Sequence, residues 1–134
     1  MRRAAGAGLM GRRSLLRIFA AVLVALPGCL SPTLPLPPPE VPDSIGPQAT
    51  NPRMWTISGP CLEGALVVVF NERTGEGAVV EDRDRDGRYE AEIEADPCDL
   101  AWVSQALGED ESARTTFVVQ ERTPSGPVDP LACK

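Results

Sequence analysis

Residues 86–95 read Asp-Gly-Arg-Tyr-Glu-Ala-Glu-Ile-Glu-Ala, and this stretch decides the fold. After the turn dipeptide Asp86-Gly87, which predicts a β-hairpin, apolar residues alternate with glutamates. Successive side chains of a β-strand point to opposite faces, so the alternation predicts a strand with one dry face and one wet face. Glu90, Glu92 and Glu94 are therefore expected on a solvated face, not as the paired carboxylates of a glycosidase.

Short apolar runs separated by turn residues lie on both sides of this stretch, a pattern typical of β-sandwiches and barrels. The chain holds 14 prolines and 12 glycines, which exclude a helical bundle because both residues break helices. We predict an all-β fold, a small antiparallel β-sandwich of about six short strands. Besides 89–95, the strands are expected at residues 54–58, 65–71, 78–81, 100–107 and 115–120.

A family resemblance rests on residues 64–71, on the turn Thr74-Gly75 and on residues 84–89. Through these segments, residues 53–120 resemble the small Ig-like or carboxypeptidase-regulatory-like β-sandwich modules of bacterial surface lipoproteins. The resemblance implies an accessory, adhesive or spacer domain without an active site. It bears on architecture more than on activity, because one fold serves many functions.

The amino terminus has the layout of an export signal. Arg12 and Arg13 precede an apolar run at residues 18–26, which is shorter than the roughly 20 residues of a membrane-spanning helix. Leu26-Pro27-Gly28-Cys29 then resembles the lipobox of bacterial lipoproteins. The resemblance implies cleavage between Gly28 and Cys29, lipidation of the Cys29 sulfur and acylation of the new amino group. Leu30 follows this cysteine, and a residue other than aspartate at that position resembles the pattern of Gram-negative lipoproteins that are sorted to the outer membrane.

Several alternatives stay open for this segment. The cysteine can be incidental to an ordinary secretory signal, or the apolar run can be an uncleaved anchor. Residues 12–17 resemble a twin-arginine export motif with leucine where phenylalanine is usual, although a plain basic region is the preferred interpretation. Met10 can replace Met1 as the start, because residues 10–29 form a complete signal alone.

The predicted organisation has four parts. Residues 1–28 form the lipoprotein signal peptide, and residues 29–52 form a proline-rich linker that begins with the lipidated Cys29. Eight prolines between residues 30 and 52 favour polyproline II, in which a spacer of this length would reach about 70 Å. Residues 53–120 form the β-sandwich, and residues 121–134 a loose carboxy-terminal tail.

Export places the remaining cysteines in an oxidising compartment, where disulfides persist. Cys61, Cys98 and Cys133 then allow one intramolecular bridge, and we expect Cys61 to pair with Cys98 because both follow a proline at a loop-to-strand junction. If the strands simply alternate in direction, however, these two loops lie at opposite ends of the domain. Either one connection then crosses differently, or the bridge involves Cys133, and the connectivity stays open.

Composition excludes several functions. The chain has no histidine, which removes every mechanism that needs an imidazole. Residues 29–134 carry 8 basic and 19 acidic side chains, an excess of acid that disfavours nucleic acid as a partner. We therefore expect no enzyme and no cofactor beyond the covalent lipid. The expected partner is a membrane, reached through the lipid anchor, with an unidentified envelope protein or polysaccharide as a further candidate.

Asp82, Asp84 and Asp86 with Gly87 match the first half of a calcium-binding EF-hand loop. The twelfth position is Ile93 instead of glutamate, and Arg83, Arg85 and Arg88 offset the local charge, so a hairpin turn is the simpler interpretation. Weak calcium binding remains the alternative.

Trp55 and Trp102 are expected to fill the core, with a sugar-stacking platform as the alternative. Taken together, the sequence predicts a non-enzymatic, membrane-anchored lipoprotein of the bacterial cell envelope, located in the outer membrane. It would display one β-sandwich as a structural or interaction module. The alternative function is a calcium-assisted or carbohydrate-binding adhesion module.

Overall fold

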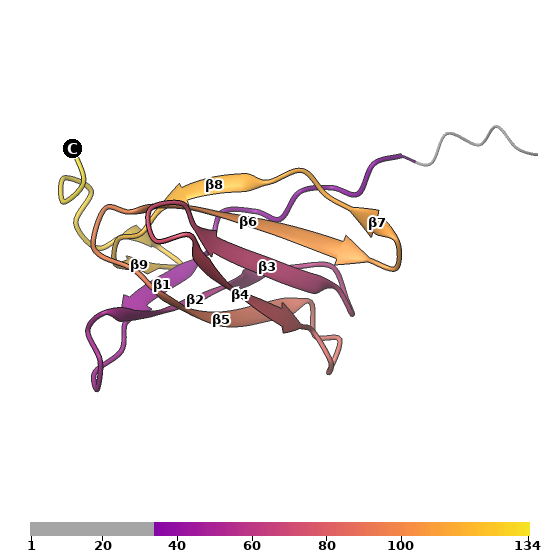
Figure 1. The fold of residues 1–134 in the computed structure, drawn as a ribbon, viewed down its shortest axis with the longest axis horizontal. Helices are drawn as coiled ribbons and strands as arrows, with labels where there is room; N and C mark the ends of the chain where they lie inside the picture. The colour runs from indigo at the N-terminus through magenta and orange to yellow at the C-terminus, as the bar shows by residue number, and fades with distance from the viewer. Residues whose placement is uncertain (1–33) are drawn as a thin grey trace, which may run out of the picture. The chain divides into compact units, whose positions relative to one another are not determined.

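Ten β-strands and no helix make up the regular structure of residues 34–134, the part of the chain that the computed structural model describes (Figure 1). The all-β prediction is therefore confirmed. All six segments that were predicted as strands form strands, and the structure contains four further short strands. In chain order the strands are β1 (Ser44–Pro47), β2 (Met54–Pro60), β3 (Leu66–Asn71), β4 (Glu76–Glu81), β5 (Arg88–Glu94), β6 (Leu100–Leu107), β7 (Asp110–Glu111), β8 (Thr115–Val118), β9 (Arg122–Thr123) and β10 (Gly126–Pro127).

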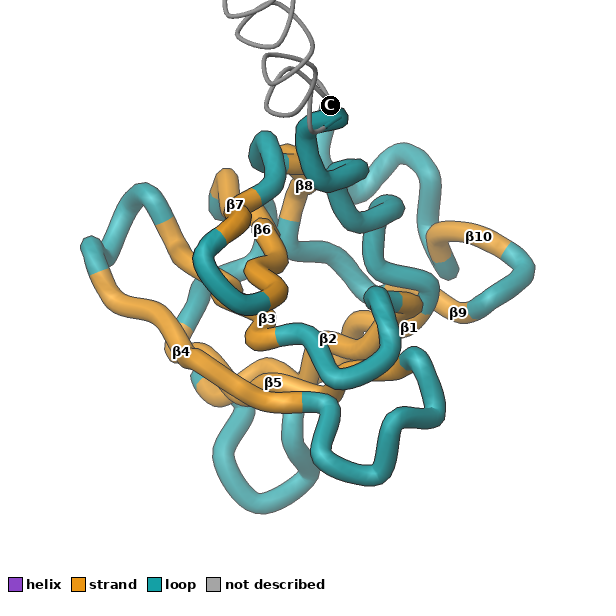
Figure 2. Tube along the Cα trace, turned by 90° about the vertical axis from the view of Figure 1, so that its right-hand side faces the viewer, coloured by secondary structure: helices purple, strands orange, loops and turns teal. Residues whose placement is uncertain are grey.

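The strands form two antiparallel sheets packed face to face. Sheet A has the order β10-β9-β1-β2-β5, and sheet B has the order β4-β3-β6-β7, with β8 pairing another part of β6. Viewed from the side in Figure 2, β3 and β6 lie across from β1, β2 and β5. The predicted sandwich arrangement is confirmed.

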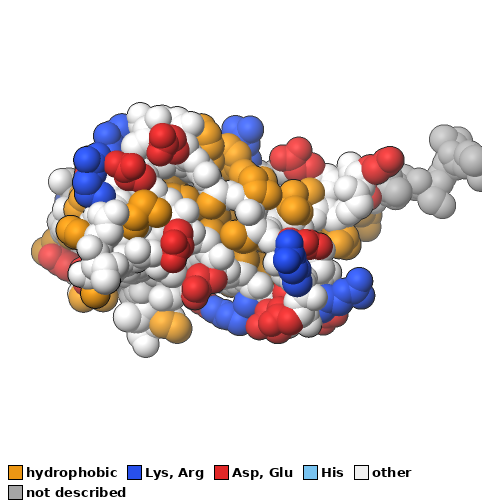
Figure 3. Space-filling view, turned by 60° about the horizontal axis from the view of Figure 1, so that its bottom comes forward, with side chains coloured by type: hydrophobic (Ala, Val, Ile, Leu, Met, Phe, Trp, Pro, Cys, Tyr) orange, Lys and Arg blue, Asp and Glu red, His pale blue; other side chains and the backbone are white. Residues whose placement is uncertain are grey.

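The core lies between the inner faces of the two sheets, as the period-two pattern requires. On β5, Tyr89, Ala91 and Ile93 are buried while the alternate glutamates point to solvent. Sheet B contributes Val67 and Val69 from β3, which are fully buried. On the face seen in Figure 3, acidic and basic side chains intermix instead of forming one patch of a single sign.

The turn at Asp86-Gly87 does not close a hairpin, contrary to the prediction. β4 pairs with β3 in sheet B, whereas β5 pairs with β2 in sheet A, so residues 82–87 carry the chain from one sheet to the other. The dipeptide signals a reversal with a positive φ at glycine, and Gly87 has φ 74°. A reversal of this kind serves a sheet-to-sheet corner as well as a hairpin.

The proline-rich segment is not a free spacer over its predicted length. β1 pairs with β2 from Ser44↔Ser58 to Pro47↔Trp55, and Ile45 is buried in the core. Before β1, the carbonyl oxygens of Pro37 and Pro39 accept hydrogen bonds from the Gln105 and Thr115 side chains. Proline loses its N–H but keeps its carbonyl acceptor, which explains how so proline-rich a segment docks. Figure 1 shows the segment before β1 running along the molecule beside β8.

Residues 121–134 are likewise part of the fold instead of a loose tail. Arg122 in β9 pairs with Ile45 in β1, and β10 folds back onto β9. The tail thus extends sheet A through β1, a strand that sequence patterning also missed. Because each of these strands has four residues or fewer, neither contains a recognisable alternation.

Candidate functional site

The carboxylate of Asp82 organises the loop that carries the candidate calcium ligands. Asp82 is buried at 3% exposure, directly after β4. Its Oδ2 accepts hydrogen bonds from the backbone N–H of Gly64 at 3.0 Å and of Gly87 at 3.1 Å, and its Oδ1 accepts from Asp86 N–H at 3.2 Å. Burial opposes ionisation of this carboxyl, but its hydrogen bonds with Gly64, Gly87, Asp84 and Asp86 together outweigh burial, so the pKa of Asp82 is lowered.

The structure brings the three aspartates together. Carboxylate oxygens of Asp82, Asp84 and Asp86 all lie within 4.8 Å of one another, and within residues 34–134 no other three acidic, cysteine or histidine side chains gather this closely. A carboxylate oxygen has two lone pairs. Asp82 Oδ2 uses both, whereas Oδ1 accepts one bond and keeps one pair for a cation. Asp84 and Asp86 are exposed and border an open cleft of about 380 Å³.

Two of the three arginines in this loop point to other carboxylates. Arg88 donates two hydrogen bonds to Asp43, at 2.9 and 3.0 Å, and the Arg83 guanidinium lies 3.2 Å from Glu81. The guanidinium groups of Arg83 and Arg88 thus form their ion pairs with Glu81 and Asp43, not with the three aspartates. The positive charge of Arg88 still acts on Asp86, and its backbone N–H donates to Asp86 Oδ1 at 2.8 Å, so the local charge is offset in part, as expected.

Ile93, at the position of the missing calcium ligand, is 2% exposed and belongs to the core. It cannot supply an oxygen, so any cation would be held by the three aspartates, backbone carbonyls and water. The arrangement can therefore support at most a partial, water-rich cation site. The hydrogen bonds give this loop a structural role, since Asp82 links it to Gly64 before β3.

The two tryptophans have different surroundings. Trp55 lies in the core at 4% exposure, as predicted. Trp102 is half-buried on the outer face of sheet B, so the prediction that it fills the core is wrong. Phe70 stacks on it at 5.1 Å between ring centroids, and the Arg114 guanidinium lies 4.0 Å from its ring centre. Sugar stacking needs an open indole face, which these two neighbours restrict.

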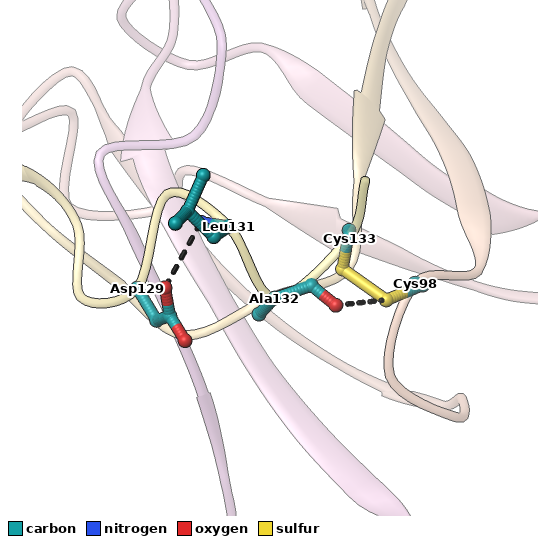
Figure 4. Close-up of a disulfide and its surroundings, with 5 residues drawn as sticks. All are labelled: Cys98, Asp129, Leu131, Ala132 and Cys133. Carbon is teal, nitrogen blue, oxygen red and sulfur yellow. Dashed lines mark hydrogen bonds between the residues drawn. A yellow bond between two sulfur atoms is a disulfide. The ribbon is translucent and has the colours of Figure 1, made fainter.

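The disulfide joins Cys98 to Cys133, not to Cys61 (Figure 4). Their Cα atoms lie 5.3 Å apart, inside the range for a disulfide. Cys61 follows the end of β2 that pairs with Arg88, whereas Cys98 lies just after Glu94, which pairs with the opposite end of β2. The two loops therefore lie at opposite ends of the sandwich, which is the geometric difficulty that the sequence raised.

Cys61 is a free thiol that packs against the core. Burial raises its pKa to about 11, with further contributions from the negative charges of Asp82 and Asp86. A thiol of this kind is mostly protonated at neutral pH, and the thiolate is the reactive form. Cys61 is therefore expected to react slowly as a nucleophile at neutral pH.

A buried polar network at the other end of the sandwich carries no signal in the sequence. Asn71 is fully buried and donates to the Asp99 carboxylate at 2.8 Å and to the Glu94 carbonyl at 3.0 Å. Arg73 donates to the same Asp99 carboxylate and, at 2.7 Å, to Asp96. The hydrogen bond from Arg73 is the main reason that the pKa of Asp99 is lowered to about 2.

The predicted lipidation and cleavage residues, Cys29 and Gly28, lie outside the described residues, as does the rest of the predicted signal peptide. Among residues 34–134 no helix is long and apolar enough to cross a bilayer. Comparisons with protein-family models, with curated proteins and with solved structures find no significant match for the chain.

Proposed function

We propose that this chain is a non-enzymatic lipoprotein, anchored in a membrane of a bacterial cell envelope, that displays its β-sandwich as a structural or interaction module. The observation that supports it is the Cys98–Cys133 disulfide. Disulfides persist in oxidising compartments, so this pairing accords with export. Export is what the lipobox-like residues Leu26-Pro27-Gly28-Cys29 imply.

The position of the first docked prolines sets how far the sandwich reaches from such an anchor. Residues 30–37 connect Cys29 to Pro37, whose carbonyl is bound by Gln105. At roughly 3.3–3.6 Å per residue, eight residues span at most about 28 Å. The domain would therefore stand close to the bilayer, not at the distance of about 70 Å that a free spacer allows. Two or more acyl chains on Cys29 would hold it there stably.

Lipid labelling tests the anchor. Cells producing the wild-type chain, Cys29→Ala or Cys61→Ala are grown with labelled palmitate and fractionated. We expect label and membrane association in the wild type and in Cys61→Ala, which controls for thiol loss. The Cys29→Ala chain should carry no label and should leave the membrane fraction. Equal labelling of the wild type and Cys29→Ala contradicts the proposal.

A calcium-assisted adhesion module is the second candidate. It is favoured by the clustering of Asp82, Asp84 and Asp86 within 4.8 Å and by the outward pairing of Arg83 and Arg88. Millimolar calcium should then raise the Tm of the wild type but not that of the double variant Asp84→Asn/Asp86→Asn. An unchanged wild-type Tm removes this candidate. The carbohydrate-binding form has less support, because Phe70 and Arg114 flank Trp102.

A further inference from the structure

The outer face of sheet B, which we call the sheet B face, is largely apolar. Figure 1 shows its strands β8, β6, β3 and β4 side by side. On β3 the fully buried Val67 and Val69 point inward, so the residues that alternate with them point outward. Residues directly opposite one another on paired strands share a face. The apolar residues of the sheet B face are therefore Leu66, Val68, Phe70, Val79, Leu100, Trp102, Ala106 and Val118.

The two sheets differ sharply in what they expose. Within residues 34–134, every large apolar side chain that is exposed on a strand belongs to sheet B, and Val79 is the most exposed of them at 61%. Sheet A instead turns the glutamates of β5 outward. A sheet normally buries an apolar face against another layer of the protein, so the sheet B face calls for a covering layer. The exposed residues in question are Leu66, Val79, Leu100, Leu107 and Val118.

Charges beside these apolar residues balance on each flank. On the β4 flank, Glu81 forms an ion pair with Arg83 at 3.2 Å. On the opposite flank, Glu111 pairs with Ala106 across β6 and β7, and the Arg114 guanidinium lies over the Trp102 ring. Residues 29–134 as a whole carry 8 basic and 19 acidic side chains, so two copies repel each other over most of their surface. The sheet B face is where this repulsion is weakest.

Trp102, Phe70 and Arg114 form a cluster near the middle of the sheet B face. The two rings stack at 5.1 Å between centroids, and the guanidinium lies 4.0 Å from the indole centre. Tryptophan and arginine are enriched among the residues that carry most of the binding energy of protein interfaces. Arg114 forms no ion pair with any residue that the structure describes. Its charge is therefore available to a carboxylate of a partner.

The size of the sheet B face limits how tightly a partner can bind. Four strands about 4.8 Å apart, with about six residues each, cover about 20 Å by 20 Å, or roughly 400 Å². Exposed apolar patches of this size often mark interaction sites. Two such faces together would bury about 800 Å², less than the roughly 1,200–2,000 Å² of a stable interface. Pairing through this face is therefore expected to be reversible.

We propose that the sheet B face binds the same face of a second copy of this chain, forming a reversible two-fold dimer. A two-fold axis parallel to the strands places β4 of each copy opposite β8 of the other. Arg114 then faces the second copy's Val79 and Glu81, which are neighbours on the outer face of β4. An axis across the strands would instead bring the two Arg114 side chains together, where like charges repel. The inference goes beyond the proposed function and does not depend on Cys29.

Photo-cross-linking in intact cells tests the pairing. Two copies of the full chain with different epitope tags are produced together. The photoreactive residue p-benzoylphenylalanine replaces either Val79 on the sheet B face or Glu92 on the outer face of sheet A. Irradiation should give an adduct that contains both tags from position 79 and none from position 92. The proposal is overturned by the absence of a two-tag adduct from position 79, by equal adducts from both positions, or by adducts with a different protein only.

Matched lysine variants test the orientation, with the photoreactive residue at Val118 of the same face. Val79→Lys sets a cation opposite the second copy's Arg114 and should lower the two-tag yield at least about tenfold. Thr56→Lys adds the same charge to the outer face of sheet A and should leave the yield unchanged. Arg114→Glu, which faces the second copy's Glu81, should repeat the loss at a second exposed position.

Thermal unfolding of the variants confirms that each one folds. A wild-type yield in Val79→Lys or Arg114→Glu, or an equal loss in Thr56→Lys, overturns the proposal. None of these outcomes alters the lipid-labelling result, so the anchor and the dimer fail separately.

Discussion

Asp82 shows how one carboxylate can define a loop. Its two oxygens accept backbone N–H groups from Gly64, Asp86 and Gly87, which come from two segments of the chain. Such N–H groups have no strand partner in a corner between sheets, and a buried group without a partner is costly. The aspartate therefore contributes to the fold whether or not a cation binds beside it.

Replacing Asp82 should destabilise the protein far more than replacing its neighbour. Asp82→Ala leaves three backbone N–H groups without their acceptor, and we expect the Tm to fall by at least about 5 °C. Asp84→Ala is the control, because Asp84 is exposed and accepts no backbone hydrogen bond within the loop. Thermal unfolding followed by circular dichroism measures both. Equal Tm values for the two variants would contradict the structural role of Asp82.

Asp99 predicts a specific acid sensitivity. Its pKa is lowered from 3.8 to about 2 in the folded protein, chiefly by the hydrogen bond from Arg73. A carboxyl with a lowered folded-state pKa stabilises the protein above its unfolded pKa, and this contribution is lost as the pH falls through the folded value. The wild type should therefore lose stability between about pH 4 and pH 2 through this group.

Urea unfolding at several pH values checks this expectation. Asp99→Asn should be less stable than the wild type at neutral pH, with a shallower decline between about pH 4 and pH 2. Asp110→Asn, at an exposed carboxylate in β7, should keep the wild-type profile. A decline in Asp99→Asn as steep as in the wild type would place the acid sensitivity elsewhere.

Among the elements, β4 depends on a glycine. Gly77 pairs with Phe70, and a Cβ at position 77 would clash with the Val69 carbonyl oxygen and lie 3.1 Å from Phe70 Cα. The Phe70 ring instead lies close to Gly77, since its Cδ2 is 3.1 Å from the same point. A glycine within a strand commonly marks such a close approach.

Gly77→Ala should therefore cost about 1–3 kcal/mol, because the backbone of β3 or β4 must shift. The matched control is Gly46→Ala in β1, where a Cβ would meet nothing within 4 Å and φ is not positive. That variant should be neutral or slightly stabilising, because alanine restricts the unfolded chain more than glycine does. Denaturant unfolding of both variants measures the difference, and similar losses would refute the clash.

For the molecule as a whole, the disulfide fastens the carboxy-terminal segment to the sandwich across a sequence separation of 35 residues. The double variant Cys98→Ser/Cys133→Ser should lose about 2–4 kcal/mol, because the unfolded chain gains freedom. Cys61→Ser, which removes the free thiol, should lose less than about 1 kcal/mol. Urea unfolding with and without a reductant tests this. A reductant should destabilise the wild type and leave the double variant unchanged, and a reductant-insensitive wild type would be contrary to the bridge.

The two ends of the domain hold different features. One end holds the docked prolines, the free Cys61 and the Asp82 loop, and the other holds the disulfide and the polar network of Asn71 and Asp99.

The sequence by itself determined the six longer strand segments, the turns between them and the two faces of β5. Side-chain alternation and turn residues are local properties, and Tyr89, Ala91 and Ile93 are buried as the pattern requires. The short strands β1, β7, β9 and β10 escaped prediction because two to four residues are too few to show a period.

The tertiary structure alone decided which partners these elements take. Pro37 and Gln105 are 68 residues apart, Pro39 and Thr115 are 76 apart, and Cys98 and Cys133 are 35 apart. The same holds for the loop at Asp86-Gly87, whose flanking strands join different sheets. Contacts of this kind depend on how whole sheets pack, because a residue's own neighbours in the chain do not specify which distant residue will face it.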